Sequence, residues 1–219
     1  HGVFELTVPS SGALKVSVVK ATGVYTVGAG EAYATIQSAV DAALGEKAFA
    51  AVWGEKADRL GRTILAKFWD GGRGALADTV KKDRFSEHGQ AMAILAGILT
   101  GDRRASALKA LVDGKGLAKV SSYFAYYLFE ALAQCGRADL VLERFRYWND
   151  FVSWGARTAF ETQHTDSRSD CHAWSACPVY FVHTAFAGVT PSSPFFKTVR
   201  VAPQPSGLKE IRSKTPCPQ

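Results

Sequence analysis

The sequence predicts a mainly α-helical protein with short β segments at both ends, and three stretches of hydrophobic pattern carry this prediction. Apolar and polar residues alternate over residues 3–8, 14–18 and 24–27, as they do in half-buried strands. From residue 34 onward, apolar residues recur every three to four positions, which is the period of a helix. After Pro191 the alternation returns at residues 198–201, and residues 208–211 are predicted to form another short strand.

The composition is typical of a globular domain and excludes several other classes of protein. Of the 219 residues, 47% are hydrophobic and 21% are charged, unlike disordered tails, collagens or coiled-coil rods. The formal net charge is +6, but the basic residues are scattered, so we expect no nucleic-acid partner. The longest apolar run, residues 91–99, is far shorter than the ~20 residues of a spanning helix, so we expect no membrane partner. The chain begins with a histidine and shows no signal-peptide pattern, which favours a processed chain or a fragment.

The cysteine pattern argues against a metal centre. The four cysteines, Cys135, Cys171, Cys177 and Cys217, form no C-x-x-C pair, and no histidine lies at zinc-finger spacing. We therefore expect no metal and no cofactor. Reduced thiols are the favoured state, which also favours a cytoplasmic chain over a secreted one. A disulfide between Cys171 and Cys177 is the alternative, because these two residues are close in sequence.

The helical pattern breaks at glycines and polar turns, and these breaks define the elements. The predicted helices cover residues 34–44, 47–69, 86–100, 104–112, 122–134, 137–150 and 173–186. Pro178 falls in the first turns of the last helix, where a missing N–H group is tolerated. Several connections are short, which favours antiparallel helical hairpins. The sequence thus divides into a β-rich segment at 1–30, a helical domain at 31–190 and the start of a β segment at 191–219.

One polar block, residues 158–178, interrupts the apolar helical part. Its functional side chains are Glu161, His164, Asp166, Arg168, Asp170, His172 and Trp174. A long polar loop between helices is a common place for a binding or catalytic site. The alternative is that these side chains only satisfy one another and cap the helix that follows, with Asp170 near its N-cap.

Five motifs, taken in their order along the chain, identify a family. They are FWD at 68–70, FSEH at 85–88, SSYFAYYLFEAL at 121–132, SRSDCHAWSACP at 167–178 and the stretch 188–203. In this order they resemble the α-L-rhamnosidases of bacteria and fungi, which are inverting glycoside hydrolases. The resemblance covers residues 47–219 and implies the C-terminal half of a catalytic (α/α)6 barrel, which is built from six helical hairpins. It also implies a rhamnose-containing glycoside or polysaccharide as the partner.

The same resemblance implies roles for individual residues. Residues 157–161 match the family's T-T-F-W-E stretch, so Glu161 corresponds to the general base of an inverting pair of carboxyl groups. His172 matches a position that contacts rhamnose. Phe160 stands where the family has a tryptophan, and it is expected to line the sugar pocket. Trp174 is expected either to wall this pocket or to fill the core.

The family's general acid has no clear counterpart in the sequence. In the family it lies in a segment that reads roughly R-D-E-R-x-G-W-x-G-D, and the nearest stretch here, 56–61, is better explained as helix surface. Because acid assistance contributes roughly 10²–10⁴-fold, we expect little or no hydrolysis by this chain alone. Half a barrel would also expose apolar faces, which favours self-association.

Two other functions stay open on the sequence. One is a non-catalytic carbohydrate-binding or structural remnant of such an enzyme. The other is a related six-hairpin glycoside hydrolase with a different sugar, because Phe160 and Cys177 depart from the family's residues at those positions.

Overall fold

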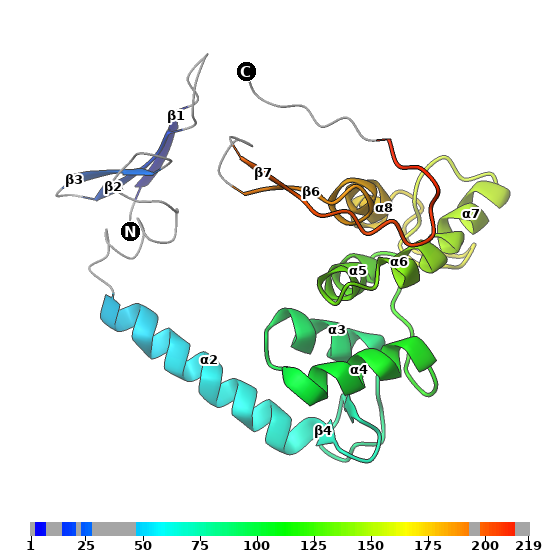
Figure 1. Cartoon of the computed structure of the whole chain (residues 1–219), viewed down its shortest axis with the longest axis horizontal. Helices are drawn as coiled ribbons and strands as arrows, with labels where there is room; N and C mark the ends of the chain where they lie inside the picture. Colours follow the sequence, from blue (N-terminus) through cyan, green and yellow to red (C-terminus); the bar gives the residue numbers. More distant parts are fainter. Residues whose placement is uncertain (1–2, 8–14, 21–22, 28–46, 193–197, 213–219) are drawn as a thin grey trace. The chain divides into compact units, whose positions relative to one another are not determined.

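The structure, a computed structural model, describes residues 3–7, 15–20, 23–27, 47–192 and 198–212 (Figure 1). The chain divides into two compact units. The first consists of His1–Leu60, Val189–Val201 and Lys214–Gln219, and the second of Gly61–Gly188 and Ala202–Ser213. The helix predicted at residues 34–44 lies outside the described residues, as does Cys217.

The N-terminal strands form an antiparallel sheet. Strands β1 (Val3–Thr7), β2 (Lys15–Lys20) and β3 (Gly23–Val27) pair in sequence order, which confirms the three alternating segments as strands. Val3 pairs with Val19 across the first ladder. A separate antiparallel pair, β6 (Val189–Pro191) with β7 (Val199–Val201), confirms the strand predicted at residues 198–201.

The strand predicted at residues 208–211 is not formed, and this prediction is wrong. Ile211 instead packs against the helical core of the second unit. Gln204 holds the preceding segment against the same core, because its side-chain amide donates to the carbonyl of Ala133 at 3.0 Å and accepts from the N–H of Ala138 at 3.3 Å. Packing onto helices thus replaces strand pairing here.

Helix α2 (Lys47–Phe68) agrees with the helix predicted at 47–69 and leads into a tight hairpin of β4 (Trp69–Asp70) and β5 (Ala75–Leu76). The carboxylate of Asp70 accepts hydrogen bonds from the N–H groups of Gly72 and Arg73, at 2.9 and 3.0 Å, which closes the turn. Residues 54–60 of α2 are exposed. They include most of the stretch nearest to the family's acid segment, so its interpretation as helix surface is confirmed.

The next helices agree with the predicted ones in position but not in all of their ends. They are α3 (Glu87–Leu95), α4 (Gly101–Asp113) and α5 (Ala125–Gln134). Helix α3 ends before residue 100 because Gly97 adopts a φ of +69° and the N–H groups of Ile98 and Leu99 turn back to the carbonyl of Ala93. Helix α4 begins before residue 104, and α5 begins after residue 122.

Two predicted helices are divided in the structure. The one at 137–150 consists of α6 (Ala138–Arg144) and α7 (Arg146–Ser153), which meet at Phe145. The ring of Phe145 lies 5.9 Å from Phe129 and 5.6 Å from Phe186, so tertiary packing fixes the break. The one at 173–186 consists of a 3₁₀ turn η1 (Ala173–Ala176), α8 (Cys177–Phe181) and a π turn η2 (Val182–Phe186). Pro178 lies at the start of α8, as predicted.

Helix α5 lies at the centre of the second unit and packs against α3, α6 and α8 (Figure 1). Its Leu128 and Phe129 are fully buried, and the Phe129 ring meets Phe181 of α8 edge-on at 5.5 Å. Each such side chain contributes about 1.5–3 kcal/mol through burial. The described part of the chain is mainly helical with a few short strands, which confirms the predicted class. None of its helices is both long and apolar enough to cross a membrane.

Candidate functional site

The first part of the polar block folds back on itself as an irregular hairpin. The N–H of Glu161 donates to the carbonyl of Ser169 at 2.9 Å, and the N–H of His172 donates to the carbonyl of Ala159 at 2.8 Å. The hydroxyl of Thr158 donates to the carbonyl of Asp170. The N-cap of η1 is His172, two residues after Asp170, and no side-chain cap bond forms there, so the expectation that the polar block caps this helix is wrong.

This hairpin is attached to the segment that leads into α5. The Ser122 hydroxyl donates to the carbonyl of Phe160 at 2.7 Å, and the N–H of Tyr123 donates to the carbonyl of Glu161 at 3.2 Å. The Gln163 amide donates to the carbonyl of Val120 at 3.3 Å. These bonds place Glu161 beside residues 120–123, most of which belong to another of the five motifs, 121–132.

The carboxylate of Glu161 forms a two-pronged ion pair with Arg168. The Arg168 Nη2 and Nε atoms donate to the two Glu161 oxygens at 2.7 and 3.0 Å. The Glu161 side chain is 16% exposed, whereas that of Arg168 is 82% exposed. The hydrogen bond from Arg168 lowers the pKa of Glu161, and the nearby His172 lowers it further. Glu161 is therefore ionised at neutral pH, which a general base requires.

Three rings gather next to Glu161 and are called the aromatic cluster: Tyr123, His172 and Trp174. The Tyr123 ring meets His172 edge-on at 5.3 Å and lies 5.8 Å from Trp174. Trp174 is 65% exposed, so the alternative that it fills the core is wrong. The structure thus brings three of the sequence-predicted residues, Glu161, His172 and Trp174, into one neighbourhood.

Two polar atoms of the segment 172–175 lack hydrogen-bond partners among the described residues. They are Nε2 of His172 and the hydroxyl oxygen of Ser175, both of which are buried. Such atoms are rare in folded proteins because leaving them unpaired costs about 1–3 kcal/mol each. A buried water molecule is the usual partner of such groups.

Phe160 lies apart from the aromatic cluster. Its ring packs 5.2 Å from Phe151 of α7 and 6.2 Å from Trp154. Within the described residues, these are the ring contacts that Phe160 makes. The Phe160 side chain therefore packs the hairpin against α7. Its backbone carbonyl instead accepts the hydrogen bond from Ser122, in the segment before α5.

Sequence reasoning missed a buried anchor behind the site. Glu87, from the FSEH motif, is completely buried. Its carboxylate accepts from Arg144 at 2.6 and 3.2 Å, from Lys119 at 3.0 Å and from the N–H of Val120 at 3.0 Å. Burial acts to raise the pKa of Glu87, but these hydrogen bonds outweigh it and lower the pKa overall. The sequence carried no clear signal for this role, because a carboxylate in the first turn of a helix is common on exposed surfaces.

Arg168 and Tyr123 are the other residues whose roles the sequence did not reveal. Arg168 stood in the polar block without an assigned partner, and Tyr123 stood inside the 121–132 motif. The backbone hydrogen bond between residues 161 and 169 brings Arg168 close to Glu161. No pattern in the sequence predicts that the chain folds back at this point.

The cysteines of the described part are not paired. Cys135, Cys171 and Cys177 are free thiols, so the alternative disulfide between Cys171 and Cys177 is not formed. Burial raises the pKa of Cys177 to about 12, which makes it unreactive. Among the residues that the structure describes, no group of three or more His, Cys, Asp or Glu side chains could hold a metal ion.

Comparison with known proteins gives two informative matches, both to solved structures. No protein-family model and no curated protein matches the chain. The crystal structure of the GH78 family rhamnosidase of Bacillus sp. GL1 matches 77% of the chain at 30% sequence identity, with a TM-score of 0.69. A rhamnosidase from Klebsiella oxytoca with rhamnose bound matches 63% of the chain at 25% identity, with a TM-score of 0.55.

The chain spans only a small part of each of these proteins, 20% of the first and 29% of the second. Both matched proteins are rhamnosidases, the family that the five motifs resemble. The chain is thus structurally similar to a part of the GH78 rhamnosidases, as the motifs predicted.

Proposed function

We propose that the chain is part of a glycoside hydrolase of the α-L-rhamnosidase type, with Glu161 as the general base. The observation that carries this proposal is an ionised carboxylate held beside the aromatic cluster, in a chain similar to rhamnosidases. One of these relatives has rhamnose bound, which supports a glycoside or polysaccharide with terminal α-L-rhamnose as the partner. The helices would then belong to an (α/α)6 barrel, within a helical domain at residues 31–190.

In the proposed reaction, Glu161 takes a proton from a water molecule as the water oxygen attacks the anomeric carbon. The bond from this carbon to the leaving-group oxygen breaks, and that oxygen takes up a proton from an acid. Attack on the face opposite the leaving group inverts the anomeric configuration. His172 and Trp174 would bind the sugar, and Phe160 would support the hairpin from behind.

The sequence contains a candidate base but no match to the family's acid segment. The expected activity therefore depends on whether the leaving group needs a proton. Rhamnosides with poor leaving groups need a proton on the departing oxygen, so we expect little or no hydrolysis of them by this chain. A 2,4-dinitrophenyl leaving group departs without protonation. A site with a working base should therefore still accelerate hydrolysis of 2,4-dinitrophenyl α-L-rhamnoside.

The experiment compares the full chain with its Glu161→Gln variant on that substrate and on methyl α-L-rhamnoside. We expect hydrolysis of the dinitrophenyl compound only, at a rate that falls roughly 10²-fold or more in the variant. Glu143→Gln, which alters an exposed carboxylate of α6, is the matched control and should leave the rate unchanged. Equal rates for the wild type and Glu161→Gln would contradict the role of Glu161. Faster hydrolysis of a different dinitrophenyl glycoside would favour a six-hairpin enzyme for another sugar.

A second candidate function is carbohydrate binding without turnover. The exposure of the Trp174 ring beside Tyr123 favours it, because an exposed aromatic face is suited to stack on a sugar. Saturable binding of L-rhamnose without hydrolysis of the dinitrophenyl substrate would support this function over the first.

A further inference from the structure

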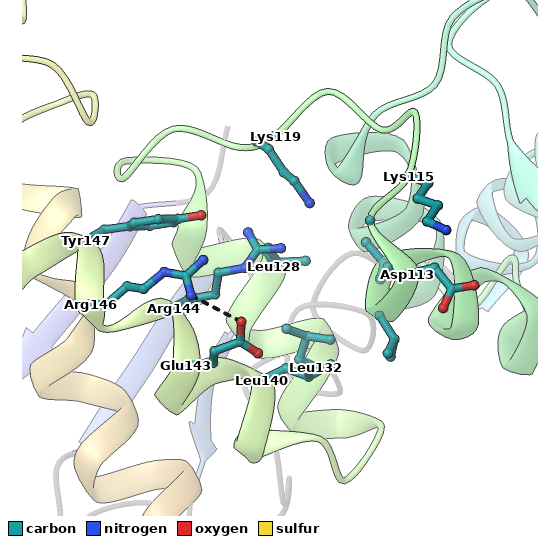
Figure 2. A pocket seen from close by; sticks show the side chains of 13 residues that line it. Asp113, Lys115, Lys119, Leu128, Leu132, Leu140, Glu143, Arg144, Arg146 and Tyr147 are labelled. Carbon is teal, nitrogen blue, oxygen red and sulfur yellow. Dashed lines mark hydrogen bonds and ion pairs between the residues drawn. The ribbon is translucent and has the colours of Figure 1, made fainter.

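A cavity distinct from the candidate site opens between α4, the loop that follows it and helices α5–α7 (Figure 2). Its volume is about 210 Å³, and neither Glu161 nor the aromatic cluster lines it. Four leucines form its apolar wall: Leu111, Leu128, Leu132 and Leu140. A single water needs only about 10–15 Å³, so the cavity has room for a small organic molecule.

Positive charge dominates the polar lining. The cationic side chains are Lys115, Lys119, Arg144 and Arg146, and the acidic ones are Asp113 and Glu143. Figure 2 shows the Lys119 ammonium, the Arg144 guanidinium and the Tyr147 hydroxyl pointing toward the hollow from different sides. Arg146 is partly neutralised by Glu143 at 3.4 Å, on the exposed rim. Lys119 and Arg144, which both bind the buried Glu87, are therefore the cations on which the inference depends.

Lys119 and Arg144 share one carboxylate, and this leaves a positive charge in excess. Both bind Glu87, which lies completely buried, at 3.0 and 2.6 Å. The Lys119 side chain is 49% exposed and that of Arg144 is 14% exposed. An ammonium group has three N–H donors and a guanidinium group has five, so each has donors beyond those that Glu87 accepts. The cavity is the open space in front of these two groups.

Gly114 lines the cavity at the end of α4. It caps α4 with a φ of +62°, and a Cβ atom at this position would lie 2.6 Å from the Lys119 ammonium nitrogen. Any larger residue would have to displace that nitrogen. The positive φ is the reason that a glycine ends the helix here.

We infer that this cavity binds a small organic carboxylate with an apolar body. The carboxylate would accept charge-assisted hydrogen bonds from Lys119 and Arg144, and the apolar body would lie on the leucines and the Tyr147 ring. A mostly apolar pocket with a few convergent polar groups is the usual form of a small-molecule site. The inference does not depend on the proposed function, because it uses none of the residues of that site.

The test measures the binding of benzoate to the full chain at low salt by titration calorimetry. Benzyl alcohol has the same ring without the charge, and acetate has the charge without the ring. We expect saturable binding of benzoate, at least about tenfold tighter than that of either comparison compound. Equal binding of benzyl alcohol, or no saturable binding of benzoate, would overturn the inference.

A variant and a second measurement locate the site. Lys119→Met should weaken benzoate binding at least about tenfold, whereas Lys109→Met, on the exposed surface of α4, should leave it unchanged. When benzoate is added to the wild-type chain, the amide NMR shifts of Gly114, Lys119 and Tyr147 should change. This measurement does not depend on the folding of any variant. Shift changes confined to other residues, or undiminished affinity in a folded Lys119→Met variant, would refute the assignment.

Discussion

As the proposed general base, the carboxylate of Glu161 has two requirements that oppose each other. A general base must be ionised, and Arg168 ensures this by donating to both carboxylate oxygens. The same hydrogen bonds make the carboxylate less basic and compete with a water molecule for its lone pairs. Arg168 is 82% exposed, so solvent screens the pair and the side chain has room to swing away from Glu161.

Removal of this arginine should raise the pKa of Glu161 toward the ordinary value of a glutamate. Arg168→Gln removes the group that lowers the pKa most. Carbon-13 NMR of the side-chain carboxyl groups, followed during a pH titration, measures the change directly. Arg212→Gln, which breaks another exposed pair in the chain, is the control and should leave the Glu161 titration unchanged. An unaltered Glu161 titration in Arg168→Gln would show that the ion pair does not form in solution.

The residues of the site were predictable to very different degrees. Composition singled out the polar block, but only the family resemblance picked Glu161 from its several carboxylates. Trp174 was ambiguous because a tryptophan side chain suits both a core and a pocket wall, and its position on a 3₁₀ turn decided the question. The pairing of Glu161 with Arg168 depends on a backbone return that no local pattern encodes.

At the scale of elements, Glu87 joins three parts of the second unit. It lies on α3 and binds Arg144 at the end of α6 as well as Lys119 and Val120 in the loop before α5. The Gln163 amide then binds the Val120 carbonyl, so this loop also supports the hairpin that carries Glu161. A substitution of Glu87 should therefore lower the free energy of unfolding of the whole helical unit.

Glu87→Gln should lower the free energy of unfolding by about 3 kcal/mol, because it leaves two clustered cations without their carboxylate. Urea denaturation followed by circular dichroism measures this. Glu143→Gln removes one partner of an exposed pair and should change the same free energy by less than about 1 kcal/mol. Equal effects of the two substitutions would mean that the buried cluster does not stabilise the unit.

The stabilities of the wild type and Glu87→Gln should also depend differently on pH in acid. Since the pKa of Glu87 is lowered in the folded chain, its ionised form stabilises the fold above the unfolded carboxyl pKa of about 4.3, and this stabilisation is lost as the pH falls through the lower folded value. The wild type should thus lose stability more steeply than Glu87→Gln below that pH. Parallel acid denaturation curves for the two proteins would contradict this sign.

Element boundaries were less predictable than the elements themselves. Periodicity identified α2 and α5 because their apolar residues repeat at helical spacing. It missed the break at Phe145, since an aromatic residue also fits the helical period and only its contacts with Phe129 and Phe186 turn the chain. It also led to a predicted strand at 208–211, where the segment packs on helices through Ile211 instead.

At the scale of the whole molecule, exposed apolar side chains on η1, α8 and η2 should cause self-association. Trp174, Val179, Tyr180 and Val182 are all exposed along this segment, with Val179 at 68%. Sedimentation at increasing protein concentration should detect dimers or larger species. Val179→Lys should reduce them, whereas Val152→Lys, which replaces a valine of similar exposure on α7, should not. A monomer at all concentrations would contradict the prediction.

The central claim is that this chain presents a sugar-binding surface of rhamnosidase type at the aromatic cluster, and binding of free L-rhamnose tests it most directly. Titration of the full chain, of Trp174→Ala and of Trp154→Ala compares an exposed tryptophan inside the cluster with one outside it, which packs on Phe151 and Phe160. We predict saturable binding to the wild type and to Trp154→Ala, and binding at least about tenfold weaker to Trp174→Ala. Absence of saturable rhamnose binding by the wild type, or equal affinity in all three proteins, would contradict the account.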